Sequence, residues 1–148
     1  MKKIISTLLV LLLIGNVAFA QKKDKKNNNK SLVGVNWVLK TIEKENAPES
    51  TKTAYILFGE GDRMSGCLGC NQFFGTYTFS KKKISIDYAG STKMMCLNNE
   101  TEQQFSKALK KEIRYFSIQK NVLTLLDRKK NSILTFEAVD AIPEVKLD

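Results

Sequence analysis

Three cysteines are the residues of this sequence whose type and spacing best suit chemistry. Cys67 and Cys70 lie three positions apart among glycines, in the stretch SGCLGCNQFFGTY, and Cys96 lies far downstream. Such a set could bind a metal ion, exchange disulfides with another protein, or form a structural disulfide. The chain has no histidine, which limits the first of these chemistries.

The neighbouring residues favour a structural disulfide. A structural zinc site needs four ligands, most often cysteine and histidine, and this chain offers three cysteines. We therefore expect no metal and no cofactor. A redox Cys-x-x-Cys pair usually begins a helix, whose N-terminus lowers the thiol pKa, whereas the run NQFFGTYTF after Cys70 alternates like a strand. A thiol-active protein that uses Cys67 is the alternative interpretation.

A disulfide from Cys96 could reach either of the two upstream cysteines. Either bond would close a loop of about 26 residues or slightly more and stabilise the fold by about 3.5 kcal/mol, so energetics does not choose between them. In an extended strand Cys67 and Cys70 would face opposite ways, so only one would point at Cys96. The remaining sulfur is then either a buried small hydrophobe or a free thiol.

The small and polar residues around these cysteines are best explained by structure. Gly66, Gly69 and Gly75 allow a positive φ or a close backbone approach, as a bulge or a barrel corner requires. We expect the side-chain amide of Asn71 to bind nearby backbone and fix that corner. Met94 and Met95, which lie next to Cys96 in the sequence, are expected to fill gaps in the core.

Catalytic groups are sparse. Without histidine, general acid–base catalysis would depend on Glu60, Asp62, Asp87 or a lysine, and these carboxylates stand in no recognisable pair. Ser65 and Ser91 have no base beside them in a known motif. We therefore expect no enzymatic activity.

The N-terminus has the pattern of a secretory signal peptide. Lys2 and Lys3 precede an apolar run from Ile4 to Ile14, and Ala18-Phe19-Ala20 provides a cleavage site after Ala20. The apolar run is shorter than the roughly 20 residues that cross a bilayer. We expect residues 1–20 to be removed and the protein to be exported to the periplasm, the outer envelope or the medium, where disulfides persist.

Residues 21–30, QKKDKKNNNK, form a Lys/Asn-rich segment that we expect to be a disordered linker. Together with Lys2 and Lys3 it holds six of the formal net charge of +9, so about +3 remains for the rest. At most we expect weak electrostatic contact with a membrane. The lysines concerned are Lys22, Lys23, Lys25, Lys26 and Lys30. No basic face with interleaved aromatic residues indicates nucleic-acid binding.

Residues 31–139 read as one domain, mostly β. VGVNWVLKTI alternates as a first strand with Trp37 as a core anchor, and further strand patterns follow at TAYILF, QFFGTYTFS with ISID, RYFSIQ, VLTLLD and SILTFEAV. One helix is expected over about residues 100–112, with Asn99 and Glu102 as a capping box. Short strands and tight turns predict an antiparallel sheet curled into a barrel or a partly open barrel, followed by a tail over 140–148.

Several of these residues resemble the META domain, also called the heat-shock HslJ-like family. The resemblance rests on SGCLGCNQFFGTY, on STKMMC ending at Cys96, on Glu102, Phe105 and Leu109, and on VLTLL. It implies a small β-rich domain of bacterial envelope or secreted proteins, with a barrel-like sheet and a packed helix. It also implies a disulfide between Cys70 and Cys96, which leaves Cys67 as a free thiol.

The family has no established enzymatic activity, so the resemblance and the residues agree. Together they predict a monomeric, non-enzymatic, exported module that binds an envelope protein or polymer or supports stress resistance outside the cytoplasm. An apolar surface patch or cavity without polarised titratable groups would be its mark.

Overall fold

Nine strands and one helix make up residues 31–145, the part of the chain that the computed structural model describes. The expected signal peptide, residues 1–20, and the expected linker, residues 21–30, lie outside the described residues. The elements are β1 (Asn36–Ile42), β2 (Glu45–Asn46), β3 (Tyr55–Phe58), β4 (Arg63–Cys67), β5 (Gln72–Ser80), β6 (Lys83–Ser91), α1 (Glu100–Leu109), β7 (Tyr115–Gln119), β8 (Val122–Leu126) and β9 (Ser132–Val139).

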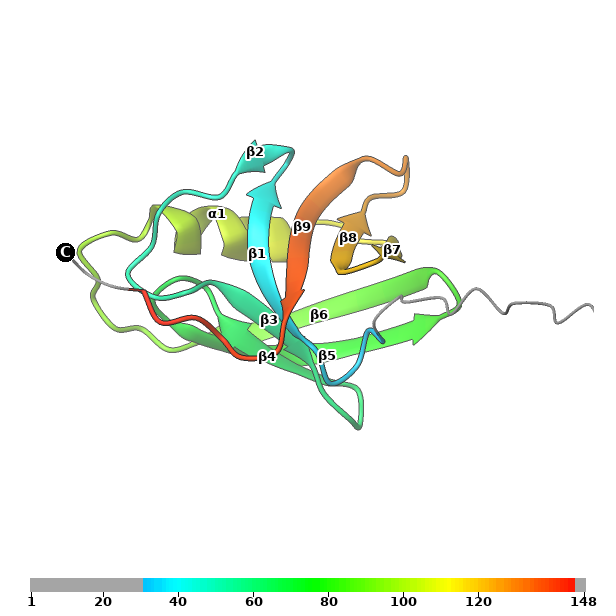
Figure 1. The fold of residues 1–148 in the computed structure, drawn as a ribbon, viewed down its shortest axis with the longest axis horizontal. Coiled ribbons are helices and arrows are strands. Elements are labelled where there is room, and N and C mark those ends of the chain that lie inside the picture. The colour runs from blue at the N-terminus through cyan, green and yellow to red at the C-terminus, as the bar shows by residue number, and fades with distance from the viewer. Residues whose placement is uncertain (1–30, 146–148) are drawn as a thin grey trace, which may run out of the picture.

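The strands form one antiparallel sheet whose hydrogen bonding runs almost around a ring. The order is β2-β1-β3-β4-β5-β6-β7-β8-β9, and β1 also pairs with β9. One junction is narrow, because β6 and β7 share only the pair Lys83 and Tyr115. The connection across this junction contains α1, which passes behind β1 and β9 in Figure 1. The predicted class, mostly β with a barrel-like antiparallel sheet and one helix, is confirmed.

Aromatic side chains fill the space between the sheet and the helix. Trp37 is fully buried, and its indole N–H donates to the carbonyl of Leu32 at 3.0 Å. Phe105 of α1 packs between Phe73 and Phe136, with ring centroids 5.8 Å from each. Full burial of a large apolar side chain stabilises a fold by roughly 1.5 to 3 kcal/mol, so these contacts fix α1 on the sheet.

Two strands, the two-residue β2 and the longer β4, were not predicted. β4 pairs along its length with both β3 and β5, yet its sequence RMSGC contains few β-branched or aromatic residues to indicate a strand. Gly66 explains the position, because a Cβ there would lie 2.1 Å from the carbonyl oxygen of Tyr55. The sequence gives no signal for this strand because the close approach of the β3 backbone and of the Phe73 ring, 2.7 Å from the same Cβ position, selects glycine.

The expected capping box at the start of α1 is wrong. Asn99 makes no side-chain capping hydrogen bond, and the first free N–H, that of Glu100, donates instead to Oδ1 of Asn98 at 3.2 Å. Glu102 is turned away from the helix end and accepts hydrogen bonds from Asn71. The helix also ends at Leu109 and not near residue 112, although Ile113 beyond it is buried as the helical pattern required.

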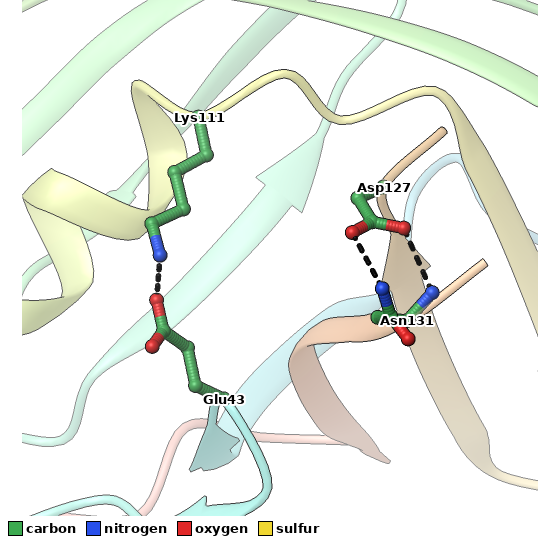
Figure 2. Close-up of polar contacts among 4 residues, drawn as sticks. All are labelled: Glu43, Lys111, Asp127 and Asn131. Atoms are coloured by element: carbon green, nitrogen blue, oxygen red, sulfur yellow. Dashed lines mark hydrogen bonds and ion pairs between the residues drawn. The ribbon is translucent and has the colours of Figure 1, made fainter. Parts of the chain in front are cut away.

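Side chains also fix segments outside the sheet. The amide of Asn36 donates to the carbonyl of Asp140 at 3.4 Å, and the hydroxyl of Thr53 donates to the carbonyl of Pro143. The described part of the expected tail therefore lies against the sheet. Figure 2 shows a second tie, the ion pair between Glu43 in the β1–β2 turn and Lys111 just after α1.

Candidate functional site

The structure joins Cys70 to Cys96, the pairing that the family resemblance implied. Cys70 lies in the turn between β4 and β5, and Cys96 lies in residues 92–99, between β6 and α1, which we call the disulfide loop. The two Cα atoms are 6.4 Å apart and the bond spans 26 residues of sequence. A bridge of this length constrains the unfolded chain substantially.

Cys67 is a free cysteine and is buried. It ends β4, where it pairs with Tyr55 and Gln72, and it lines a pocket of about 370 Å³ together with residues 142–145. Burial raises the pKa of the Cys67 thiol above its ordinary value, despite a backbone hydrogen bond from Gly69 that lowers it. Because the thiolate is the nucleophile in disulfide exchange, this environment opposes that chemistry.

A buried asparagine connects the disulfide to the helix. The backbone N–H of Asn71 donates to Oε2 of Glu102 at 2.9 Å, and its side-chain amide donates to both carboxylate oxygens at 3.0 Å. Hydrogen bonds to a charged acceptor are roughly twice as strong as neutral ones. Glu102 therefore binds the β4–β5 turn to α1.

The same asparagine holds the backbone of the disulfide loop. Its Oδ1 accepts from the N–H of Met94 and from the hydroxyl of Thr92, both at 2.7 Å, while its Nδ2 donates to the carbonyl of Met94 at 3.1 Å. Gly69, with φ of +111°, makes the turn that places Asn71 there, and a side chain at Gly69 would lie 2.9 Å from Cβ of Ser50. The expected backbone role of Asn71 is thus visible in its contacts.

Residues 47–54, which we call the facing segment, are tied to the same region. The hydroxyl of Thr101 donates to the carbonyl of Pro48 at 2.7 Å and approaches that of Glu49 at 3.2 Å. The side chain of Asn98 donates to the carbonyl of Glu49 at 3.1 Å. The N–H of Lys52 donates to the carbonyl of Gly69 at 2.8 Å. The facing segment and the disulfide loop are therefore held at a fixed separation.

A groove of about 1120 Å³ lies between them. The disulfide loop forms one wall, and its apolar side chains are exposed: Met94 is 52% exposed, Met95 is 100% exposed and Leu97 is 108% exposed. The lining residues are Leu39, Lys40, the facing segment, Cys70, residues 94–98, Thr101 and Val145.

The prediction that Met94 and Met95 fill the core is wrong. Asn71 binds the N–H and the carbonyl of Met94, so the backbone of the loop, and not its side chains, faces the protein. Both thioethers are consequently directed outward, to the rim of the groove.

The carboxylates and hydroxyls considered for catalysis do not gather in this groove. Asp62 lies in the β3–β4 turn, where its carbonyl accepts from the N–H of Tyr77, and Asp87 is exposed on β6. Ser65 is exposed on β4. Of the carboxylates within residues 31–145, Glu49 alone lines the groove, whose lining also includes Lys40 and Lys52.

Gly75 lies away from the groove and serves the sheet. The β5–β6 register shifts between Phe74 and Gly75, and a Cβ at Gly75 would lie 2.2 Å from the carbonyl oxygen of Asp87.

Among residues 31–145 there is no group of three or more histidine, cysteine, aspartate or glutamate residues placed to hold a metal ion. Within the same residues, no helix is long and apolar enough to cross a membrane.

These features define a class of protein, namely a small antiparallel β domain with one packed helix and one disulfide at the helix start. A family model described as the META domain matches residues 30–140, which is most of the chain. The chain therefore belongs to the META-domain family. No curated protein matches it significantly.

Solved structures resemble this fold. An NMR structure of a protein from Burkholderia xenovorans is 22% identical and aligns with a TM-score of 0.59, over 74% of this chain and 85% of its own. A second protein solved by NMR is 26% identical and aligns with a TM-score of 0.53, over 70% of this chain and 87% of its own. These likenesses concern the fold.

Proposed function

We propose that this META-domain protein is an exported, non-catalytic binding module and that the groove beside its disulfide binds the partner. The observation that carries the proposal is the rim, where Met95 and Leu97 are fully exposed on a loop whose backbone is fixed. Exposed apolar side chains gathered on one surface are typical of interaction sites. A fixed backbone lowers the entropy lost when a partner binds.

The chemistry of the groove favours an extended segment of another envelope protein as the partner. The walls are a loop and an irregular segment that run beside one another, and the rim offers thioether and leucine side chains to apolar residues. Methionine adapts to differently shaped apolar partners. Lys40 already pairs with Glu137 at 2.9 Å, so Lys52 is the lining cation offered to acidic residues of that segment.

A random peptide library displayed on phage tests this proposal. We expect the wild-type protein to enrich peptides with apolar residues next to an acidic one, and we expect the double variant Met95→Ser with Leu97→Ser to bind those peptides at least tenfold more weakly. Gln103→Ser with Gln104→Ser, two exposed substitutions on α1, is the matched control and should bind like the wild type. If both double variants bound the enriched peptides equally well, the binding site would lie elsewhere on the protein.

The rival function, thiol–disulfide exchange through Cys67, has less support because the thiol is buried and its pKa is raised. Alkylation of the native, unreduced protein distinguishes the two. Slow modification of Cys67 by iodoacetamide agrees with a binding module, whereas modification at the rate of an exposed low-pKa thiol would favour exchange chemistry.

Export is part of the same proposal, and it rests on the signal-peptide pattern of residues 1–20. A disulfide in the structure suits an oxidising compartment. N-terminal sequencing of protein recovered from cell envelopes or medium should begin at Gln21.

A role in stress resistance would appear as impaired growth of a deletion strain under heat or envelope stress. The wild-type gene should restore growth, and the Met95→Ser, Leu97→Ser variant should not.

A further inference from the structure

Basic residues concentrate at the end of the fold opposite the groove. Residues 81–83, 112–115 and 127–131 contain seven basic residues and only two acidic ones, Glu112 and Asp127. The rest of the described chain contains nine basic and eleven acidic residues. The positive charge of this domain is therefore a local feature. The seven basic residues are Lys81, Lys82, Lys83, Arg114, Arg128, Lys129 and Lys130, which we call the basic end.

The narrow junction between β6 and β7 brings these three segments together. The N–H of Ile84 donates to the carbonyl of Arg114 at 3.1 Å, and the N–H of Arg114 donates to the carbonyl of Leu126 at 2.8 Å. Lys83, Arg114 and Arg128 then line one pocket of about 440 Å³ with Tyr115. Figure 1 shows the β5–β6 and β8–β9 turns at one end of the molecule, and the connection from β6 to α1 at the other.

The two carboxylates of this region are already engaged. Oε1 of Glu112 accepts from Nε and Nη2 of Arg114 at 2.9 and 2.6 Å, which orients the guanidinium. Asp127 accepts from the backbone N–H of Asn131 at 2.8 Å and from its side chain at 2.9 Å, as Figure 2 shows. These two hydrogen bonds close the turn that carries Arg128, Lys129 and Lys130. The side chains of all three cations are exposed at the surface.

Aromatic rings accompany the cations. Phe79 is 46% exposed and lines a second, adjoining pocket with Lys83 and Arg114, and Tyr115 is half-buried beside them. Tyrosine is enriched at membrane–water interfaces, and phenylalanine is among the apolar residues that enter the headgroup boundary in surface-bound helices. Clusters of lysine and arginine attract anionic lipid headgroups.

We propose that the basic end docks on an anionic lipid surface, where its lysines and arginines contact phosphate groups and Phe79 lies at the headgroup level. The cations are spread over three segments, and this arrangement suits the many phosphate groups of a lipid surface better than one small ligand. Docking in this way turns the groove away from the lipid and toward a partner.

Vesicle sedimentation with purified protein tests this inference. Vesicles of phosphatidylglycerol mixed with phosphatidylcholine should bind the protein, and vesicles of phosphatidylcholine alone should not. Each basic residue near an anionic bilayer contributes about fivefold to binding, so Lys82→Gln with Arg128→Gln and Lys129→Gln should weaken it by about a hundredfold. These positions avoid the turn residues with positive φ, Lys81 and Lys130.

The matched control removes the same amount of charge from outside the basic end. Lys52→Gln with Lys93→Gln and Lys107→Gln should retain most of the binding, and thermal unfolding should show that both triple variants fold. Residues 21–30 are the same in all three proteins, so the comparison isolates the charges of the folded domain. Equal losses in the two triple variants, or no binding to phosphatidylglycerol, would overturn the inference. Tight binding to dextran sulfate beads without vesicle binding would also overturn it, in favour of a polyanionic polymer.

Discussion

The two ends of this domain hold their loops in opposite ways. At the groove end, a disulfide and a buried asparagine bind the backbone of the disulfide loop, while its apolar side chains remain exposed. At the basic end, the turns are short hairpins whose shape depends on local contacts such as Asp127 with Asn131. The groove end is thus fixed by a covalent bond and buried side-chain hydrogen bonds, whereas the basic end is fixed by backbone hydrogen bonds between its segments and by contacts within its turns.

This difference indicates what each end requires. An apolar rim exposed to water would collapse onto the protein if its backbone were free, because burial of apolar surface is favourable. Covalent and buried polar ties prevent that collapse. Lysine and arginine side chains are well solvated and need no such restraint, so hairpin turns are sufficient to present them.

Replacement of Asn71 should have the largest effect on stability. Asn71→Ala removes the side-chain hydrogen bonds to Met94, Thr92 and Glu102 and leaves the part-buried carboxylate with only the backbone N–H of residue 71 as a donor. We expect a loss of about 4 kcal/mol in the free energy of unfolding, measured by urea denaturation. The corresponding change at the basic end, Asn131→Ala, should barely shift the midpoint. Similar losses in the two variants would contradict the contrast between the ends.

Loss of the disulfide should come next. Cys70→Ala with Cys96→Ala should lower the free energy of unfolding by about 3.5 kcal/mol, since the 26-residue connection is no longer constrained in the unfolded chain. Cys67→Ala leaves the bond intact and removes one buried sulfur, so it should cost only about 1 kcal/mol. If Cys67→Ala were the more damaging of the two, the free thiol would have a structural role that its contacts do not explain.

Changes on the rim of the groove should hardly affect stability. Met95→Ser with Leu97→Ser alters side chains that are exposed, and surface substitutions of this kind usually change the free energy of unfolding by less than about 0.5 kcal/mol. The same variant should lose peptide binding. A large drop in melting temperature would show instead that the rim is part of the core.

The smallest effect should be the pH dependence of the β8–β9 turn. Hydrogen bonds from the side chain and backbone of Asn131 hold the pKa of Asp127 below its ordinary value. The folded pKa is depressed, so the associated stabilisation is present above the ordinary carboxyl pKa and is lost as pH falls through the folded value. An NMR titration should show a higher pKa for Asp127 in Asn131→Ala than in the wild type.

Much of the fold could be predicted from the sequence because its signals are local. The alternation in QFFGTYTFS and the spacing of Phe105, Ala108 and Leu109 both reflect burial on one face. The structure buries the three helix residues and, in the strand, Phe73 and Tyr77, whereas Phe79 near the strand end is 46% exposed. β4 could not be predicted in this way, because Gly66 is selected by the backbone of β3 across the sheet.

The site was predicted only in part for a related reason. The family resemblance of the motif around Cys70 implied its disulfide with Cys96, and the residue type of Asn71 indicated its structural role. The outward direction of Met94 and Met95 depends on Asn71, more than twenty residues away in sequence. Glu102 was interpreted as a helix cap because that role is local, whereas its actual partner is the same distant asparagine. Apolar character alone does not distinguish a core residue from an exposed rim.

Amide hydrogen exchange in the disulfide loop tests the central claim, that this loop is held as a preformed rim. In the oxidised protein the N–H of Met94, which donates to Oδ1 of Asn71, should exchange slowly. Mild reduction should accelerate its exchange while the N–H of Ile84, bonded to Arg114 at the other end, remains protected. Exchange of Met94 at the rate of an unstructured peptide in the oxidised protein would contradict the account.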